Sequence, residues 1–346
     1  MEIIIGLIII AIGAFCQSSC YVPINKVKEM SWESYWLVQG CFAWLIFPMM
    51  GAWLAVPEGR HFYEMFASAP AFNLWMTIFF GVLWGVGGLT FGLSMRYLGV
   101  ALGQSIALGT CAGLGTIMGP VLLNIYFPEQ KPLESLTAAV IIGVVVTLIG
   151  IAIIGIAGHM KAQSLSEEEK KEAVKDFNFP KGIVIALLAG FMSGCFNVGL
   201  EFGKDINFGE MTNPMFSTLP ATLLVTIGGF FTNAAYCLYQ NYKHNTWADY
   251  HRSGDVNLNN LLFCALAGLL WYSQFFGLSL GKGFLTESPT LTTFAFCILM
   301  ALNVVFSNVW GIILKEWKGV SKKTIVVLLI GIVVLIVSTF VPELLK

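Results

Sequence analysis

The sequence is short of charge. Only 11% of its 346 residues are Asp, Glu, Lys or Arg, whereas 57% are hydrophobic. A soluble domain carries about 25% charged and about 45–50% apolar residues. The formal net charge of −1 also lacks the basic excess that a nucleic-acid partner requires. These shortages exclude a soluble enzyme, suggest no nucleic-acid partner, and indicate a chain that packs apolar side chains in lipid.

Cysteine pairs and a cleavable leader are missing as well. The eight cysteines all lie in apolar stretches, and no CxxC pair occurs, so we expect packing residues rather than disulfides, metal ligands or a cofactor site. The N-terminus has neither the basic region nor the small-residue cleavage site of a secretory signal. The first apolar stretch is therefore expected to stay in the membrane.

Long uncharged stretches account for nearly the whole chain. A membrane-spanning helix needs about 20 mostly apolar residues. Ten stretches of 19 or more residues contain no Asp, Glu, Lys or Arg: 3–25, 34–57, 65–95, 97–128, 135–160, 182–200, 211–242, 256–281, 288–314 and 324–342. The sequence therefore predicts an all-α integral membrane protein with ten transmembrane helices.

The basic residues predict how these helices run. The odd-numbered connections hold 14 of the 19 Lys and Arg residues, and the other side holds 5. Cytoplasmic loops carry an excess of Lys and Arg. We therefore expect the odd connections in the cytoplasm and both termini outside.

The two halves of the chain resemble each other. A polar segment, 158–181, separates residues 1–157 from 182–346, with five predicted spans on each side. The end of the third span, Phe91–Met95 (FGLSM), matches the end of the eighth, Phe276–Leu280 (FGLSL), and other short matches follow in the same order. An odd number of spans per repeat inserts the second copy upside down, which is typical of secondary transporters. The sequence thus predicts a cytoplasmic linker between two five-helix inverted repeats.

Polar and aromatic side chains near mid-span are the candidates for a solute site. Such groups either bond neighbouring helices or face a cavity. The amides offer four hydrogen-bonding sites each, and the two tryptophans occupy matched places in the repeat, where they serve either core packing or stacking. The candidate substrate contacts are Gln17, Trp84, Gln104, Asn197, Trp271, Tyr272, Gln274 and Asn303.

The chemistry of these candidates favours a neutral solute. No ionisable side chain lies at mid-span, whereas an anionic substrate would require a fixed cation. Amides can bond hydroxyl groups, and aromatic rings can cover the apolar face of a sugar. Glu201 lies at the outer rim of the sixth span, where it either snorkels to the interface or serves as a proton-binding gate.

Several segments resemble one known family. They are Ser31–Trp36 (SWESYW), Leu83–Gly87 (LWGVG), Gly268–Phe276 (GLLWYSQFF) and Leu314–Trp317 (LKEW). The chain is similar over essentially its full length to the bacterial L-rhamnose–proton symporters, which belong to the drug/metabolite transporter superfamily. This resemblance implies proton-coupled uptake of L-rhamnose across the bacterial inner membrane, with sugar, protons and the lipid bilayer as partners.

Three other functions compete with this interpretation. An exporter or exchanger of another small neutral metabolite would use the same fold. A membrane-embedded enzyme is disfavoured because no HExxH, GxSxG or intramembrane Asp pair occurs. A structural or receptor-like protein would have little use for an inverted repeat. The residues leave open the exact sugar, the choice between proton and sodium, and the oligomeric state.

Overall fold

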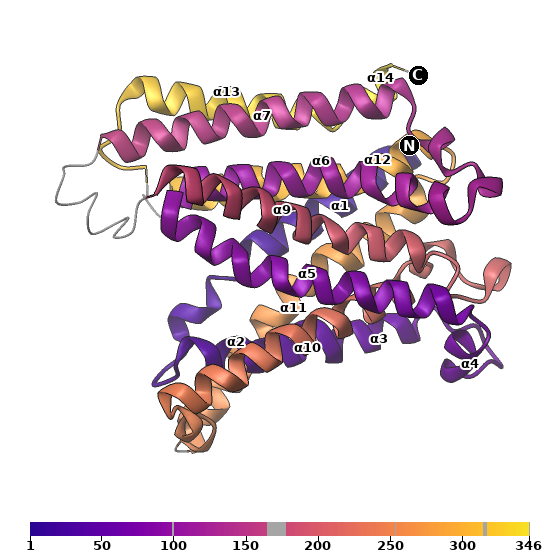
Figure 1. Cartoon of the computed structure of the whole chain (residues 1–346), viewed down its shortest axis with the longest axis horizontal. Coiled ribbons are helices and arrows are strands. Elements are labelled where there is room, and N and C mark those ends of the chain that lie inside the picture. The colour runs from indigo at the N-terminus through magenta and orange to yellow at the C-terminus, as the bar shows by residue number, and fades with distance from the viewer. Residues whose placement is uncertain (99, 165–177, 253, 314–316, 346) are drawn as a thin grey trace. The chain divides into compact units, whose positions relative to one another are not determined.

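The computed structural model describes residues 1–98, 100–164, 178–252, 254–313 and 317–345. In these residues all regular secondary structure is helical, which confirms the predicted all-α class (Figure 1). The helices form two compact units. Unit 1 contains Met1–Gly85 and Phe202–Phe284, and unit 2 contains Val86–Glu201 and Leu285–Lys346.

Unit 1 is built on α1, α2, α3, α10 and α11. Its elements are α1 (Glu2–Ser19), η1 (Pro23–Lys26), α2 (Trp32–Gly40), the π-helical η2 (Cys41–Ile46), α3 (Phe47–Trp53), α4 (Phe62–Ala67), the first half of α5 (Ala71–Leu98), η5 (Gly209–Met211), η6 (Pro214–Phe216), α10 (Leu219–His244), η7 (Trp247–His251) and α11 (Gly254–Phe284).

Close backbone approach organises unit 1. Helix α1 packs along α11, where a Cβ atom at Gly13 would lie 2.9 Å from the carbonyl oxygen of Ser273. Helix α10 packs against α2 and α3. Small residues permit such contacts between membrane helices, in which dispersion and hydrogen bonding replace the hydrophobic effect.

Unit 2 is built on α6, α7, α9, α12 and α13. It contains the second half of α5, α6 (Val100–Tyr126), η3 (Pro128–Gln130), η4 (Pro132–Ser135), α7 (Ala138–Gln163), α9 (Phe179–Phe202) up to Glu201, α12 (Pro289–Ile313), α13 (Lys322–Ser338) and α14 (Val341–Leu344). Helix α7 lies along both α6 and α13, and α12 packs on α6 (Figure 1).

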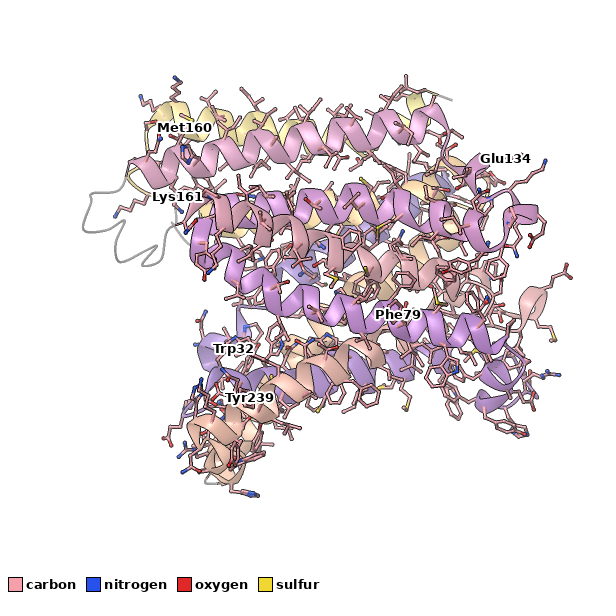
Figure 2. The ribbon with its side chains drawn as sticks, in the orientation of Figure 1. Trp32, Phe79, Glu134, Met160, Lys161 and Tyr239 are labelled. Atoms are coloured by element: carbon pink, nitrogen blue, oxygen red, sulfur yellow. The ribbon has the colours of Figure 1, made fainter. Side chains whose placement is uncertain are left out.

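Charged residues lie at both ends of the apolar helix α7. In Figure 2 Met160 and Lys161 lie at one end of α7, and Glu134 lies beyond the other end. Thr137 caps the first turn by accepting from the Val140 N–H group. Because 26 residues at about 1.5 Å each exceed the hydrocarbon thickness of a bilayer, α7 is long enough to span it.

Nine helical segments of the described chain are long and apolar enough to cross a membrane. They correspond to the first nine predicted spans. The tenth predicted span falls on α13, an apolar helix of only 17 residues. At about 1.5 Å per residue, α13 alone is somewhat shorter than a hydrocarbon core of about 30 Å.

The two units are defined by contacts between residues, whereas the two predicted repeats are defined by sequence similarity. Each unit takes helices from both halves of the chain, and the chain passes between the units next to Gly85, Glu201 and Phe284. Most of the predicted linker, residues 165–177, lies outside the described residues. The division into 1–157, 158–181 and 182–346 therefore stays a prediction.

Candidate functional site

Three tryptophan side chains of unit 1, here called the tryptophan cluster, meet within the apolar helices. Trp44 lies edge-on to Trp84 and Trp271, with ring centroids 6.0 and 5.9 Å away. The rings of Trp84 and Trp271 are 5.6 Å apart. Trp44 is 2% and Trp271 8% exposed, whereas Trp84 is partly exposed. Trp84 therefore carries the accessible side of the cluster.

A local irregularity places Trp44 in this cluster. Helix α2 continues into the π-helical segment Cys41–Ile46, at whose end the Phe47 N–H group bonds to the Phe42 carbonyl. Pro48 has no N–H group to offer the carbonyl of Trp44, four residues earlier. The extra residue in the turn changes the helical phase, and π turns are frequent at functional sites.

Trp84 and Tyr272 pack directly against glycines of neighbouring helices. A Cβ atom at Gly229 of α10 would overlap the ring of Trp84, and one at Gly51 of α3 would overlap the hydroxyl of Tyr272. The rings are thus held directly against the backbone. Any side chain at these two positions would displace them.

The helices that carry the cluster also carry buried polar atoms that lack a hydrogen-bond partner in the described chain. Within the described residues, the Nε1 atom of Trp44, the hydroxyl of Tyr272 and the Oε1 atom of Gln39 are buried without a hydrogen-bond partner. Buried polar groups in native proteins are nearly always satisfied, so each exception needs an explanation. A hydroxyl-rich ligand is one group that could satisfy them.

The two glutamines predicted for this region lie on packed helices. Gln274 is 3% exposed on α11, and its Nε2 atom donates to the Trp271 carbonyl at 3.2 Å. Gln17 is partly buried in the last turn of α1, the helix that packs along α11. Gln274 therefore lies one helical turn from Trp271, the cluster residue on α11.

The amides predicted in unit 2 have different surroundings. Asn197 of α9 is 3% exposed and donates through Nδ2 to the Gly115 carbonyl of α6 at 2.8 Å. Its Oδ1 atom has no hydrogen-bond partner within the described residues. Asn303 of α12 is 5% exposed. Gln104 is on α6, but its side chain lies outside the described residues.

Glu201 lies in the last turn of α9 and is partly exposed. A Cβ atom at Gly119 of α6 would lie 2.7 Å from the Cγ atom of Glu201, so the stem of this side chain packs closely on α6. This placement agrees with a residue at the end of a membrane helix.

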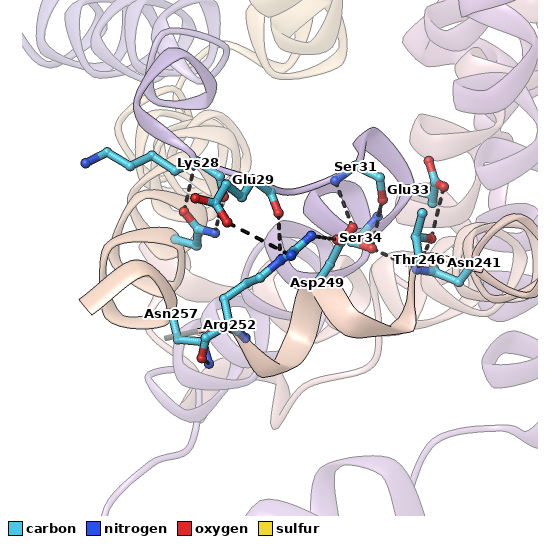
Figure 3. Close-up of polar contacts among 11 residues, drawn as sticks. Lys28, Glu29, Ser31, Glu33, Ser34, Asn241, Thr246, Asp249, Arg252 and Asn257 are labelled. Atoms are coloured by element: carbon cyan, nitrogen blue, oxygen red, sulfur yellow. Dashed lines mark hydrogen bonds and ion pairs between the residues drawn. The ribbon is translucent and has the colours of Figure 1, made fainter. Parts of the chain in front are cut away.

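A polar network connects the α1–α2 loop to the α10–α11 loop (Figure 3). Asp249 of η7 accepts from the Ser31 N–H group at 2.9 Å and pairs with Arg252 at 2.9 Å. Burial opposes its charge, but the bonds from Ser31, Ser34 and Arg252 outweigh burial and hold the pKa of the Asp249 carboxyl below its usual value. Asp249 is therefore a charged anchor.

A second buried carboxylate, Glu33, lies in the first turn of α2 and is 7% exposed. Its Oε1 atom lies 3.1 Å from Nδ1 of His244, at the end of α10, and accepts from the Thr246 hydroxyl at 3.1 Å. This contact ties the N-terminus of α2 to the C-terminus of α10.

Two further contacts join the same helices. Asn241 of α10 donates to the Ser34 hydroxyl at 2.7 Å, and Trp36 of α2 donates through Nε1 to Oδ1 of Asn233 at 3.0 Å. The Nδ2 atom of Asn233 in turn donates to the Gly85 carbonyl of α5 at 3.3 Å. The ring of Trp36 also lies 5.6 Å from that of Trp44. The α2–α10 contacts thus reach from the polar network to the tryptophan cluster.

Comparison with known proteins assigns this chain to a family. The family of L-rhamnose-proton symport proteins matches residues 1–344. The L-rhamnose-proton symporters of Yersinia pestis (strain Pestoides F) and Yersinia pseudotuberculosis (serotype O:1b, strain IP 31758) are each 31% identical over 343 residues, covering 97% of this chain and 96% of the relative.

This chain belongs to the L-rhamnose-proton symport family. It is therefore a membrane transporter and not an enzyme, as the sequence predicts. Membership also accounts for a chain made almost entirely of apolar helices. In this family a neutral sugar and a proton are the two solutes whose binding groups must be found.

The structure brings some predicted site residues together and adds others. Trp84 and Trp271 touch in the tryptophan cluster, with Tyr272 and Gln274 next to Trp271 on α11. Sequence reasoning missed Trp44. The available signal was Pro48, four residues later, which indicates an irregular helical turn at Trp44. Sequence reasoning also missed Glu33, a carboxylate at the very start of an apolar span, and His244, 211 residues away.

Proposed function

We propose that this protein imports L-rhamnose by proton symport with alternating access. The proposal rests on membership of the family and, above all, on one observation in unit 1. Three tryptophan rings pack together among apolar helices, and these helices carry buried polar atoms, the Trp44 indole nitrogen among them, that have no partner in the described residues. Buried polar atoms without a partner are rare in native proteins, and a bound sugar is the partner that we propose for these.

The chemistry of the cluster suits a 6-deoxyhexose. The aromatic faces can cover the C–H face and the methyl group of the sugar, because both are apolar. The indole N–H group of Trp44 and the phenol of Tyr272 can bond its hydroxyl groups. A neutral sugar requires no fixed cation, and the rings supply none.

The sugar contacts that we propose in unit 1 are Trp84, Trp271, Tyr272, Gln274 and Gln17. Asn197, Asn303 and Gln104 are the proposed contacts in unit 2, where the unpartnered Oδ1 atom of Asn197 supports its assignment. Glu201 is the proton-coupling residue proposed from the sequence. A Glu201→Gln variant that still accumulates sugar normally in response to a pH gradient would remove it from this role.

The proposed architecture has ten transmembrane helices in a 5+5 inverted repeat of the drug/metabolite transporter type, with 1–157 and 182–346 as the repeats and 158–181 as a cytoplasmic linker. Helix α13 would be the tenth span, assisted at its end by the residues up to α14. The distribution of Lys and Arg supports odd-numbered loops in the cytoplasm and both termini outside the bacterial inner membrane.

Transport in purified form tests this proposal. The full chain is reconstituted in proteoliposomes, and uptake of labelled L-rhamnose is measured with and without an inside-alkaline pH gradient. We expect accumulation that depends on the gradient and collapses when a protonophore is added. Equilibration without accumulation would indicate an exchanger or exporter, and no uptake by folded protein would overturn the choice of sugar.

A further inference from the structure

Among the residues that the structure describes, two carboxylates are buried, and they differ in their partners. Asp249 is 4% exposed and is neutralised by Arg252 at 2.9 Å, so its charge is fixed. Glu33 is 7% exposed, and the ion-pair partner that contacts it is a histidine. A buried carboxylate without a permanent counter-charge is costly, so the protonation of this histidine decides the stability of the contact.

The geometry fixes where a proton would bind. An ionised carboxylate only accepts hydrogen bonds, so the Nδ1 atom of His244, 3.1 Å from Glu33 Oε1, carries the hydrogen. The remaining nitrogen, Nε2, is then the atom that takes up a proton. The His244 side chain is 47% exposed, so water can deliver that proton. One proton from solvent changes the net charge of the pair from −1 to zero, and its release restores −1.

We propose that Glu33 and His244 form a proton-binding pair that regulates the affinity of the tryptophan cluster for sugar. This inference rests on the proposed function, because it assumes that the cluster binds sugar. Protonation completes an ion pair between α2 and α10 and tightens their contact. Deprotonation leaves the buried Glu33 carboxylate without a counter-charge and loosens it. Histidine is the side-chain type whose charge changes between about pH 5 and 8.

The contacts between α2 and α10 provide the route to the cluster. From the Glu33–His244 pair inward, Ser34 bonds to Asn241 and Trp36 bonds to Asn233. The last of these contacts meets the cluster twice: the Trp36 ring lies against that of Trp44, and α10 supplies the glycine against which Trp84 packs. A small displacement of α2 relative to α10 therefore moves two of the three rings.

Other charged groups surround the pair but do not duplicate it. The Asp249 charge is already matched by Arg252, and Arg252 also reaches Glu29 at 4.0 Å. The other titratable and charged groups on the elements packed around Glu33 and His244 are Tyr35 on α2, Tyr236, Cys237, Tyr239, Tyr242 and Lys243 on α10, Asp249, Tyr250 and His251 in η7, Asp255 and Cys264 in the nearer half of α11, and Lys28, Glu29 and Arg252 in the adjoining loops.

The regulation responds to the pH on one side of the membrane. With the odd-numbered loops in the cytoplasm, as proposed above, the pair faces that compartment. Its charge then follows the cytoplasmic pH, and a more alkaline cytoplasm lowers the affinity for sugar.

Sugar binding as a function of pH tests this inference. Binding of L-rhamnose to the purified full chain is measured by calorimetry at pH 5.5 and pH 8. We expect the wild-type protein to bind up to about fivefold more tightly at pH 5.5, the factor that a partly exposed ion pair can supply. His244→Gln should bind with the weaker affinity at both pH values, and His244→Arg, which keeps a permanent charge, with the tighter affinity at both.

Matched variants separate this role from a structural one. Glu29→Gln and His251→Gln alter exposed groups of the same loops and should keep the wild-type pH dependence. Glu33→Gln should abolish the pH dependence but retain binding. If His244→Gln and His244→Arg both keep the wild-type pH dependence, the pair is not the proton site, although the proposed function stands. If the wild-type protein binds no L-rhamnose at either pH, the proposed function itself fails.

Discussion

Unit 1 and unit 2 are both bundles of apolar helices, yet their interiors differ. The interior of unit 1 holds the tryptophan cluster and both buried carboxylates of the described chain. The interior of unit 2 contains buried phenylalanines such as Phe294 and Phe296, glycine contacts such as Gly150 against Leu335, and hydroxyl bonds such as Thr147 to Ser338 at 3.0 Å. Two bundles of apolar helices therefore differ in the side chains that fill their interiors.

This contrast teaches how function is distributed in such a chain. Hydroxyl bonds within a membrane protein contribute about 0.6 kcal/mol on average, which is enough to fix a scaffold. Buried polar atoms without partners do the opposite, because they lower stability until a ligand arrives. On this account the tryptophan cluster of unit 1 supplies the main sugar contacts, and substitutions in the cluster should differ in effect from substitutions at the hydroxyl bonds of unit 2.

The largest effect on sugar binding is expected at Gly229, the glycine against which the Trp84 ring packs. In Gly229→Val the new side chain overlaps the indole ring, and overpacking of this kind costs about 1–3 kcal/mol. We expect L-rhamnose binding, measured by calorimetry, to become undetectable. Gly88→Ala on α5, the helix that carries Trp84, is the control, since a Cβ atom there meets no atom within 4 Å. Equal loss of binding in both variants would show that the effect is not due to the displaced ring.

A smaller effect, on stability alone, is expected at the anchor of the loops. Asp249→Asn removes a buried charge that Ser31 and Arg252 bind, and should lower the free energy of unfolding by about 1.5–3 kcal/mol at pH 7. Because the pKa of Asp249 is lowered, its contribution is complete above about pH 4 and is lost only as the pH falls through the lowered pKa.

Thermal melting at two pH values checks this sign. The difference in melting temperature between wild type and Asp249→Asn should be clear at pH 7 and should narrow as the pH falls below about 4. A difference that grows on acidification would contradict the lowered pKa.

Removal of the unpartnered indole N–H group should separate stability from binding. Trp44→Phe keeps an aromatic ring but deletes a buried donor that has no partner in the described residues. We expect sugar affinity to fall about twofold to tenfold, the worth of one hydrogen bond between neutral groups. The melting temperature without sugar should stay constant or rise. A lower melting temperature with unchanged affinity would make Trp44 an ordinary packing residue.

The smallest effect is predicted in unit 2. Thr147→Val deletes the hydroxyl that meets Ser338 between α7 and α13, and should lower stability by about 0.6 kcal/mol. The affinity for L-rhamnose should not change. A change in affinity greater than about twofold would show that the contact between α7 and α13 is not purely structural.

Much of the fold could be predicted because membrane helices obey a simple rule. The absence of charge over about 20 residues locates spanning helices, and nine of the ten predicted spans match helices of sufficient length. The rule is weaker for α13, which ends after 17 residues. The repeat rests on short matches that the contacts within each unit do not test.

The site was only partly predictable, for two physical reasons. Trp84 and Trp271 could be singled out together because they occupy matched positions in the predicted repeat, and in the structure their ring centroids are 5.6 Å apart. Trp44 has no such match, and the π-helical turn before Pro48 removes it from the regular helical phase. His244 and Glu33 meet across 211 residues, and no local pattern records a contact of that length.

The most direct test of the central claim is the affinity of the tryptophan cluster for sugar. L-Rhamnose binding is measured by calorimetry on the purified full chain, on Trp271→Ala, and on Trp75→Ala as a control. Trp75 is 71% exposed on α5 and lies outside the cluster. We predict that Trp271→Ala binds at least about tenfold more weakly, through lost stacking and packing, whereas Trp75→Ala binds like the wild type. Wild-type affinity in a folded Trp271→Ala variant would contradict the account.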